Sequence, residues 1–210
     1  MNRFPRLYPI LDSPTLGKRG CEDWSMVARG MLAGGAAILQ LRHKGAWTPE
    51  VLERTRQIAG ECERAGAQFV LNDRADIALL TGAGLHVGQD DLAPRDCRNI
   101  IGPAAVLGFS THNAAQLQAA AEEPVDYVAF GPIFATASKK NPDPVCGVAA
   151  LPRGLSKPLV AIGGITRATA RLVFDAGADS IALISDLLPE VLTESQIRMR
   201  MEEWQRLTRQ

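Results

Sequence analysis

The chain contains the stretch Asp126-Tyr127-Val128-Ala129-Phe130-Gly131-Pro132-Ile133-Phe134-Ala135-Thr136-Ala137-Ser138-Lys139-Lys140, in which an apolar run, a turn and a polar cluster follow one another. The apolar run ends at Gly131-Pro132, which predicts a buried strand that stops at a turn. Two hydroxyl groups and two ammonium groups come next, on Thr136, Ser138, Lys139 and Lys140. Hydroxyl donors and positive charge together suit a phosphate or a diphosphate. A lysine pair taken alone is explained more simply by a solvated basic loop, so the interpretation depends on the rest of the chain.

Composition narrows the class of protein. The chain has 210 residues, of which 46% are hydrophobic and 22% are charged, as in an ordinary globular domain. The formal net charge is zero, which argues against a nucleic-acid or membrane partner and favours a small molecule. No apolar run reaches the roughly 20 residues of a membrane span, and residues 1–6 lack the apolar core of a signal peptide. The four cysteines are widely spaced, which indicates neither a zinc site nor a disulfide framework, and we expect a cytoplasmic location.

Apolar runs typical of strands alternate with helix-like segments along the chain. Strands are predicted over 7–11, 36–41, 68–71, 85–87, 105–108, 126–130, 158–162 and 180–184. Helices are predicted over 24–32, from Thr48 to Gly66, through 77–80, over 95–101, near 148–151 and after the capping residues Asn113, Thr166 and Thr193. A loop is predicted at Asp12-Ser13-Pro14, and Pro9 argues against a central position for the first strand. The alternation predicts an α/β fold, a closed (β/α)8 TIM barrel in a single domain over residues 1–210, with an open doubly wound sheet as the alternative.

Polar side chains follow the predicted strands at their carboxyl ends. These residues are Arg42 and Lys44, Asn72 and Asp73, Asp91, Ser110, Thr136 with Ser138 and Lys139, Gly163 and Gly164, and Ser185. In a closed barrel the carboxyl ends of all strands meet at one rim, where active sites of this fold lie. In a doubly wound sheet only the loops at the switch point would meet. The sequence therefore predicts one active site at the C-terminal rim of a barrel.

Two kinds of anion site are expected at this rim. The glycine pair after the seventh strand, together with Ser185, is typical of a monophosphate site, although a tight turn also explains the glycines. Asp73 and Asp91 are two carboxylates near the cations Arg42, Lys44 and Lys139, with Asn72 and Ser110 as neutral donors. Two carboxylates that leave room for phosphate oxygens suit Mg²⁺, although each aspartate alone could cap a helix. Two such sites suggest two phosphorylated substrates.

The motifs in this chain resemble those of the thiamine phosphate synthase family. They occur in the family's order over most of the chain, and they are Gln40-Leu41-Arg42-His43-Lys44, Asn72-Asp73-Arg74, His86-Val87-Gly88-Gln89-Asp90-Asp91-Leu92, Gly108-Phe109-Ser110, Gly131 to Lys139, Ala161 to Ile165 and Ile184-Ser185. The resemblance implies a transferase that joins hydroxymethylpyrimidine diphosphate to thiazole phosphate with Mg²⁺, giving thiamine phosphate and diphosphate.

The resemblance also implies roles for individual residues. The pyrimidine diphosphate would be held by Gln40, Arg42, Lys44, Asn72, Ser110 and Lys139, and Mg²⁺ by Asp73 and Asp91. The thiazole phosphate would be held by Thr136, Ser138, Gly164, Ile184 and Ser185. Catalysis in this family is thought to begin with loss of diphosphate, leaving a carbocation that the thiazole nitrogen captures. Arg42, Lys44 and Lys139 would then be catalytic through their charge, and no side-chain nucleophile is required. The two histidines nearest the strands, His86 and His112, are expected to be structural, and residues 141–147 are expected to form a lid.

Three features of the sequence depart from the family pattern. His43 replaces a usually acidic residue, Ser138 replaces threonine, and the opening strand 7–11 differs. Two alternatives therefore stay open. The sister family of thiazole tautomerases shares the barrel, but the resemblance would require histidine in place of Pro132 and would not need Asp73. A catalytically silent phosphate-binding barrel is the other alternative. The oligomeric state is left open, a homo-oligomer included.

Overall fold

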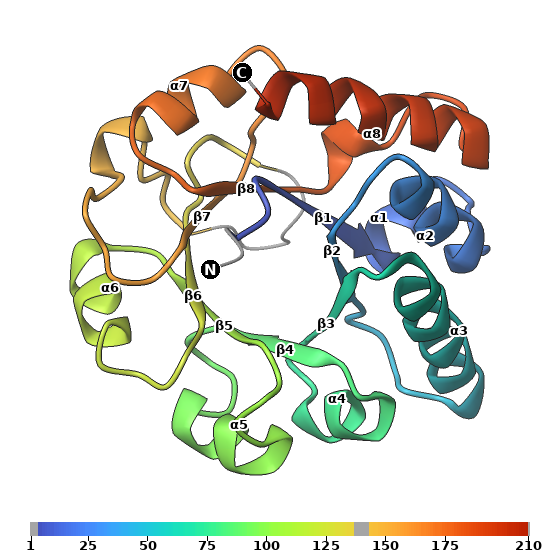
Figure 1. Cartoon of the computed structure of the whole chain (residues 1–210), viewed down its shortest axis with the longest axis horizontal. Coiled ribbons are helices and arrows are strands. Elements are labelled where there is room, and N and C mark those ends of the chain that lie inside the picture. Colours follow the sequence, from blue (N-terminus) through green and yellow to red (C-terminus); the bar gives the residue numbers. More distant parts are fainter. Residues whose placement is uncertain (1–3, 137–142, 210) are drawn as a thin grey trace.

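A closed barrel of eight parallel strands forms the centre of the molecule (Figure 1). The structure is a computed structural model that describes residues 4–136 and 143–209. Consecutive strands pair in chain order, and β1 pairs with β8 to close the ring. The strands are β1 (Leu7–Asp12), β2 (Ile38–Arg42), β3 (Gln68–Asn72), β4 (Gly84–Val87), β5 (Leu107–Thr111), β6 (Tyr127–Phe130), β7 (Leu159–Ile162) and β8 (Ser180–Leu183). This confirms the predicted barrel and excludes the doubly wound sheet.

Helices surround the barrel on its outside (Figure 1). They are α1 (Ser13–Lys18), α2 (Trp24–Ala33), α3 (Pro49–Ala65), α4 (Ala75–Thr81), α5 (Pro94–Ile101), α6 (Ala114–Ala120), α7 (Ala170–Asp175) and α8 (Glu194–Thr208), with the 3-10 helices η1 (Val148–Ala150) and η2 (Ser185–Leu187). Within residues 4–136 and 143–209, no helix combines the length and the hydropathy that a membrane span requires.

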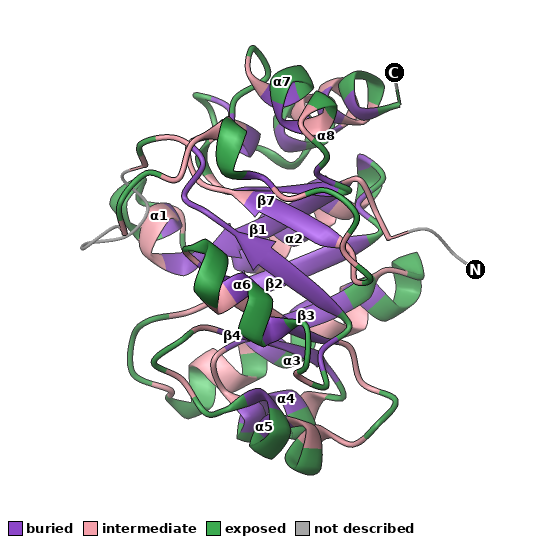
Figure 2. Cartoon of the chain, turned by 90° about the vertical axis from the view of Figure 1, so that its left-hand side faces the viewer, coloured by how far each residue is buried: buried purple, intermediate pink, exposed green. Residues whose placement is uncertain are grey.

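Both faces of the strands are buried. The outer face packs against the helices, and the inner face lines the interior of the barrel. The larger apolar cluster lies between the strands and the helices, and Figure 2 shows buried strands enclosed by helices whose outer faces are exposed. A second, smaller cluster fills the barrel and includes Tyr8, Ile38, Val70 and Tyr127. Because side chains alternate along a strand, every second residue points into the barrel. Gly108 is required there, since a Cβ at this position would lie 2.1 Å from Tyr127 Cζ.

Several predicted helix ends are confirmed by their capping contacts. The side chains of Thr48 and Asn113 accept hydrogen bonds from the backbone amides of Val51 and Gln116, at 3.4 and 2.9 Å. Thr193 caps α8 in the same way, by accepting from the amide of Gln196 at 3.3 Å. Helix N-termini of this kind can be predicted from the sequence, because a capping residue and its partner are only three residues apart.

Two helices, α1 and the 3-10 helix η2, are absent from the sequence-based prediction, and in place of α1 a loop was expected at Asp12-Ser13-Pro14. The structure has α1 there, with Asp12 as its N-cap accepting from the amide of Thr15 at 3.0 Å. Proline in the first turn of α1 supports the helix, as it does in α3. Pro9 lies inside β1 and opposite Leu183 of β8, so its expected exclusion from a central strand was also wrong.

Two other boundaries differ from the prediction. Strand β5 begins at Leu107 and continues to Thr111, past the predicted end at residue 108. Its hydroxyl groups are compatible with the sheet because Thr111 Oγ1 donates to the Ala129 carbonyl at 2.9 Å. Helix α7 begins at Ala170, and the predicted cap Thr166 instead donates its backbone amide to Thr169 Oγ1 at 2.9 Å.

Candidate active site

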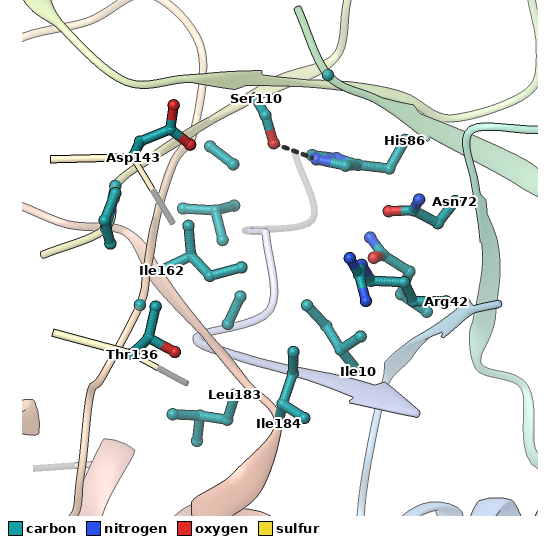
Figure 3. Close-up of a pocket in the computed structure, with 18 of the residues that line it drawn as sticks. Ile10, Arg42, Asn72, His86, Ser110, Thr136, Asp143, Ile162, Leu183 and Ile184 are labelled. Atoms are coloured by element: carbon teal, nitrogen blue, oxygen red, sulfur yellow. Dashed lines mark hydrogen bonds between the residues drawn. The ribbon is translucent and has the colours of Figure 1, made fainter. Parts of the chain in front are cut away.

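A cavity of about 960 Å³ opens where the C-terminal ends of the strands meet. Residues of all eight strands line it, among them Ile10, Gln40, Asn72, His86, Ser110, Ala129, Ile162 and Leu183. Figure 3 shows polar side chains on one side of this cavity, including Arg42, Asn72, His86 and Ser110, and Ile162, Leu183 and Ile184 elsewhere on its wall. The wall of the cavity thus combines polar and apolar side chains, as a site for a small molecule with a charged group and an apolar part requires.

The structure brings together every predicted site residue that it describes. The cavity is lined by Gln40, Arg42, Lys44, Asn72, Asp73, Asp91, Ser110, Thr136, Gly164, Ile184 and Ser185. Ser138 and Lys139 lie outside the described residues. Arg42, Asn72 and Ser110 belong to β2, β3 and β5, so they lie within strands and not beyond them as predicted.

Arg42 is held in the cavity by a buried carboxylate, that of Asp12, which is absent from the site residues predicted from the sequence. Arg42 Nη1 donates to Asp12 Oδ1 at 2.6 Å, and the Asp12 side chain is completely buried. The other oxygen of Asp12 accepts from the amide and the hydroxyl of Thr15, at 3.0 and 2.6 Å. Asp12 and Arg42 are opposite each other in the ladder between β1 and β2. The guanidinium is therefore fixed in one orientation before any substrate binds.

Asp73, Asp91 and Lys44 form the charged cluster of the cavity. Lys44 Nζ donates to Asp73 Oδ2. Burial raises the pKa of the Asp73 carboxyl, the Lys44 ammonium lowers it, and a hydrogen bond and charge from Asp91 raise it. Asp73 also has φ +66°, a conformation that is costly for a residue with a side chain and that often occurs at functional sites. Two neighbouring carboxyls, of which Asp73 is desolvated by burial, favour a bound cation.

Neither aspartate is a helix cap, which was the simpler interpretation of each. The N-caps of α4 and α5 are Arg74 and Ala93, and neither makes a side-chain capping bond. Asp91 Oδ2 instead accepts from the Gly88 amide at 2.7 Å and so closes its own loop.

The glycine pair after β7 forms a tight crossing with the turn that follows β6. A Cβ on Gly164 would lie 2.4 Å from the Ala135 carbonyl oxygen, and one on Gly163 would lie 2.5 Å from Pro132 Cβ. Both glycines have positive φ, at +101° and +62° in chain order. Packing therefore explains the need for glycine at both positions, and Gly163, Gly164, Thr136 and Ser185 all line the cavity.

His86, for which the sequence predicts a structural role, lines the cavity. Its Nε2 lies 2.8 Å from Ser110 Oγ, and its Nδ1 lies 2.9 Å from the Tyr127 hydroxyl. Tyr127 in turn lies 2.7 Å from the hydroxyl of Tyr8, a residue of the unusual opening strand. The period of two along β5 could have identified Ser110, since positions 108 and 110 share the inward face, whereas His86 joins them only through the pairing of β4 with β5.

His112 also lines the cavity. Its Nδ1 donates to the Gly131 carbonyl at 2.6 Å, and its Nε2 lies 3.6 Å from Asp143 Oδ2. Cys146 donates its amide to the Pro132 carbonyl at 2.8 Å, so the described part of segment 141–147 packs on the turn after β6. A lid function of this segment stays a prediction, and residues 141 and 142 lie outside the described residues.

His43 stands where the family usually has an acidic residue. Its side chain contacts helices α1 and α2. Its Nδ1 lies 2.7 Å from Ser13 Oγ, and its Nε2 lies 3.1 Å from the Ala46 carbonyl oxygen. Its ring lies between those of Trp24 and Trp47, with centroids 5.4 and 5.3 Å away. His43 therefore stabilises the loop that carries Arg42 and Lys44.

Comparison with known proteins agrees with this geometry. The family model described as thiamine monophosphate synthase matches residues 7–187. The chain belongs to the thiamine monophosphate synthase family. A thiamine-phosphate synthase of Koribacter versatilis is 48% identical over 191 residues, covering 89% of this chain and 90% of that protein. One of Laribacter hongkongensis is 41% identical over 183 residues, covering 85% of each chain.

A solved structure of the same family has the same fold. Thiamine phosphate pyrophosphorylase from Pyrococcus furiosus superposes with a TM-score of 0.82 and is 28% identical, covering 97% of this chain and 95% of that one. Membership of the family assigns the chain a transferase activity that forms thiamine phosphate. All these relatives are named as the synthase or pyrophosphorylase, so the tautomerase alternative is not favoured.

Proposed function

We propose that the chain joins 4-amino-2-methyl-5-hydroxymethylpyrimidine diphosphate to 4-methyl-5-hydroxyethylthiazole phosphate, releasing diphosphate and forming thiamine phosphate. One observation carries this proposal: cations, carboxylates and hydroxyl donors from separate strands and from the loops that follow them line a single cavity that also has apolar residues in its wall. The polar side suits the diphosphate, and the apolar residues Ile10, Val160 and Ile162 suit the flat faces of the two rings.

The reaction requires charge more than it requires a base or a nucleophile. When the bond between the pyrimidine methylene carbon and the diphosphate oxygen breaks, both bonding electrons leave with the oxygen. Arg42 and Lys44 would stabilise the departing anion, and Lys139 is proposed to do the same from the sequence motif alone. The thiazole nitrogen then supplies the electron pair of the new carbon–nitrogen bond. The buried pair Arg42–Asp12 contributes because a preoriented guanidinium loses little entropy when the diphosphate binds.

The thiazole phosphate is proposed to bind on the opposite side of the cavity. Thr136, Gly164, Ile184 and Ser185 line that region, and Ser138 is included from the motif. Hydroxyl and backbone donors there would hold the monophosphate, and the apolar side chain of Ile184 would contact the ring.

Asp73 and Asp91 fit a magnesium ion. They supply hard oxygen donors, and the raised pKa of Asp73 reflects a buried carboxyl close to a second one. The described residues contain no group of three or more potential protein ligands, so water and phosphate oxygens would complete the shell, as is usual for Mg²⁺. When bound, the ion would neutralise charge on the diphosphate. Lys44 would move its contact from Asp73 to the substrate.

The proposal is tested by supplying both substrates and Mg²⁺ to the purified protein and measuring diphosphate and thiamine phosphate. We expect both products in equal amounts. Asp73→Ala and Lys139→Ala should each lower the rate by about a hundredfold or more, the size of effect of losing one charged group in such a site. Asp76→Ala and Lys18→Ala, which change exposed residues of the same types, are the matched controls.

Two other outcomes would contradict the proposal, and each would support a different function. Isomerisation of the thiazole phosphate without diphosphate release would identify a tautomerase. Binding of both substrates without turnover would identify a silent phosphate-binding barrel. The cytoplasmic location and a homo-oligomeric state stay predictions, to be checked by fractionation and by sedimentation.

A further inference from the structure

A chain of five polar side chains crosses the interior of the barrel beside the cavity. Gln40 Nε2 lies 3.0 Å from the Tyr8 hydroxyl, which lies 2.7 Å from the Tyr127 hydroxyl. The Tyr127 hydroxyl lies 2.9 Å from His86 Nδ1, and His86 Nε2 lies 2.8 Å from Ser110 Oγ. Figure 3 shows the last contact, where the Ser110 hydroxyl faces the imidazole. The five residues come from five different strands.

The donors along this chain point in one direction. The Gln40 amide nitrogen can only donate, so the Tyr8 oxygen accepts from it. Tyr8 then donates its own proton to Tyr127, and Tyr127 donates to His86 Nδ1. An imidazole that accepts at Nδ1 carries its proton at Nε2. His86 therefore donates to Ser110 Oγ, and the Ser110 proton is left for an acceptor in the cavity.

The opposite direction leaves a buried donor without an acceptor. If Ser110 donated to His86, and His86 Nδ1 donated to Tyr127, then Tyr127 would donate to Tyr8. The Tyr8 oxygen would accept twice, and within the described part of the chain its hydroxyl has hydrogen-bond contacts with Gln40 and Tyr127 alone. Tyr8 is only 1% exposed, so water cannot accept its proton, and an unsatisfied buried donor is unfavourable.

The protonation of the tyrosines agrees with this order. Burial raises the pKa of Tyr8 and that of Tyr127 above the usual range of a phenol. Both hydroxyls therefore keep their protons at physiological pH and can act as donors in series.

We propose that His86 is a positioning residue: the chain from Gln40 sets its Nε2–H tautomer, and His86 thereby makes Ser110 a hydrogen-bond donor to the pyrimidine diphosphate. The inference rests on the proposed function in one respect, that Ser110 contacts this substrate. Ser110 would therefore recognise a hydrogen-bond acceptor of the substrate, which is either a ring nitrogen or a diphosphate oxygen. The ring amino group is a donor and would select the opposite tautomer.

This arrangement suits a reaction in which positive charge develops on the pyrimidine. A neutral imidazole adds no repulsive charge beside the ring, whereas a direct cationic contact would oppose the carbocation. Ser110 is also fixed through its backbone, because its carbonyl accepts from Gln89 Nε2 at 2.7 Å. Both the position and the donor role of the hydroxyl are therefore set before the substrate arrives.

The tautomer can be measured without any substrate. The chain has three histidines, so long-range ¹H–¹⁵N correlation spectra of ¹⁵N-histidine-labelled protein at about pH 8, where an ordinary imidazole is neutral, contain three ring systems. The signals of His86 are assigned by their disappearance in His86→Gln. We expect an unprotonated Nδ1 and a protonated Nε2. A protonated Nδ1 on His86 would overturn the proposal.

The role toward the substrate is tested with Tyr127→Phe, which removes one hydroxyl and keeps the ring. His86 then loses the donor at Nδ1, and we expect a mixture of both tautomers in the same spectra. The Kd for the pyrimidine diphosphate, measured by calorimetry, should rise about fivefold, the effect of one hydrogen bond, while the Kd for the thiazole phosphate stays unchanged. Ser110→Ala should raise the first Kd to a similar extent.

Thr111→Val is the matched control, because it also removes a buried hydroxyl hydrogen bond but lies outside this chain. If Tyr127→Phe leaves the Kd for the pyrimidine diphosphate equal to that of Thr111→Val, the positioning role is wrong. These binding and spectroscopic readouts do not require turnover. A wild-type protein that binds as described but forms no thiamine phosphate would contradict the proposed function and leave this inference standing.

Discussion

The Asp12 carboxylate contributes both to the stability of the barrel and to the geometry of the site. It is completely buried, and it accepts hydrogen bonds from Arg42 and from two donors of Thr15. A carboxylate in such surroundings is stabilised by its partners, and the partners depend on it equally. One residue thus begins α1 and orients the guanidinium of Arg42.

Asp12→Asn should lower both stability and activity. The amide keeps the size of the side chain but loses the charge opposite Arg42, so we expect a loss of about 1–3 kcal/mol in the free energy of unfolding. Urea denaturation measures this loss, and the Kd for the pyrimidine diphosphate should increase as well. Asp76→Asn is the control, since its pair with Arg74 is exposed and such pairs contribute under about 1 kcal/mol. Equal losses in the two variants would contradict the role assigned to Asp12.

Cys62 predicts a dependence of stability on alkaline pH. Burial raises the pKa of its thiol from 9.0 to about 12. Between these values the folded chain keeps a proton that the unfolded chain releases, so rising pH favours unfolding, by up to about 1.4 kcal/mol per pH unit. We therefore expect the free energy of unfolding of the wild type to fall more steeply above about pH 9 than that of Cys62→Ala. Parallel curves in urea denaturation from about pH 8 to pH 10.5 would show that this thiol is not protected by burial.

At the scale of the elements, the turn after β7 depends on its contact with the turn after β6. Gly164 and Gly66 have nearly the same φ, at +62° and +65°. A Cβ on Gly164 would meet the Ala135 carbonyl oxygen at 2.4 Å, whereas a Cβ on Gly66 would meet nothing within 4 Å. Substitution of Gly66 therefore measures backbone strain alone, and substitution of Gly164 measures backbone strain together with crowding.

Gly66→Ala should cost about 1 kcal/mol, the strain of a left-handed residue with a side chain. Gly164→Ala should cost about 1–3 kcal/mol more, because the two turns must separate. Urea denaturation gives both values, and only Gly164→Ala should weaken binding of the thiazole phosphate. If the two substitutions cost the same, the close crossing of the turns is incorrect.

The elements also differ in how far the sequence predicts them. Helices α3, α6 and α8 have N-terminal side-chain caps three residues from their partners, and these were predicted correctly. Helix α1 has the same signal, but its cap Asp12 was interpreted as the start of a loop because the helix is short and only partly apolar. Strand β5 was cut short because Ser110 and Thr111 are polar, and polar residues facing the inside of a barrel cannot be distinguished from a loop by hydropathy.

For the molecule as a whole, we expect removal of divalent metal to stop catalysis and to leave the barrel intact. Asp73 and Asp91 lie in the loops after β3 and β4, outside both apolar clusters, so the fold does not depend on them. Treatment with a chelator should abolish diphosphate release, and excess Mg²⁺ should restore it. The midpoint of thermal unfolding, followed by circular dichroism, should change little. Full activity in the chelator, or unfolding on its addition, would contradict this prediction.

The sequence by itself determined the number of the strands and their order along the chain, and it favoured the closed barrel and most of the residues that reach its C-terminal rim. These depend on periodicity, on caps and on motif spacing, which act over short distances along the chain. The tertiary structure decided which of those residues touch. The pair Asp12–Arg42, the contact of Lys44 with Asp73 and the chain from Gln40 to Ser110 each join different strands or their loops. Contacts of this kind arise from strand register and barrel closure, which bring together side chains that no local pattern connects.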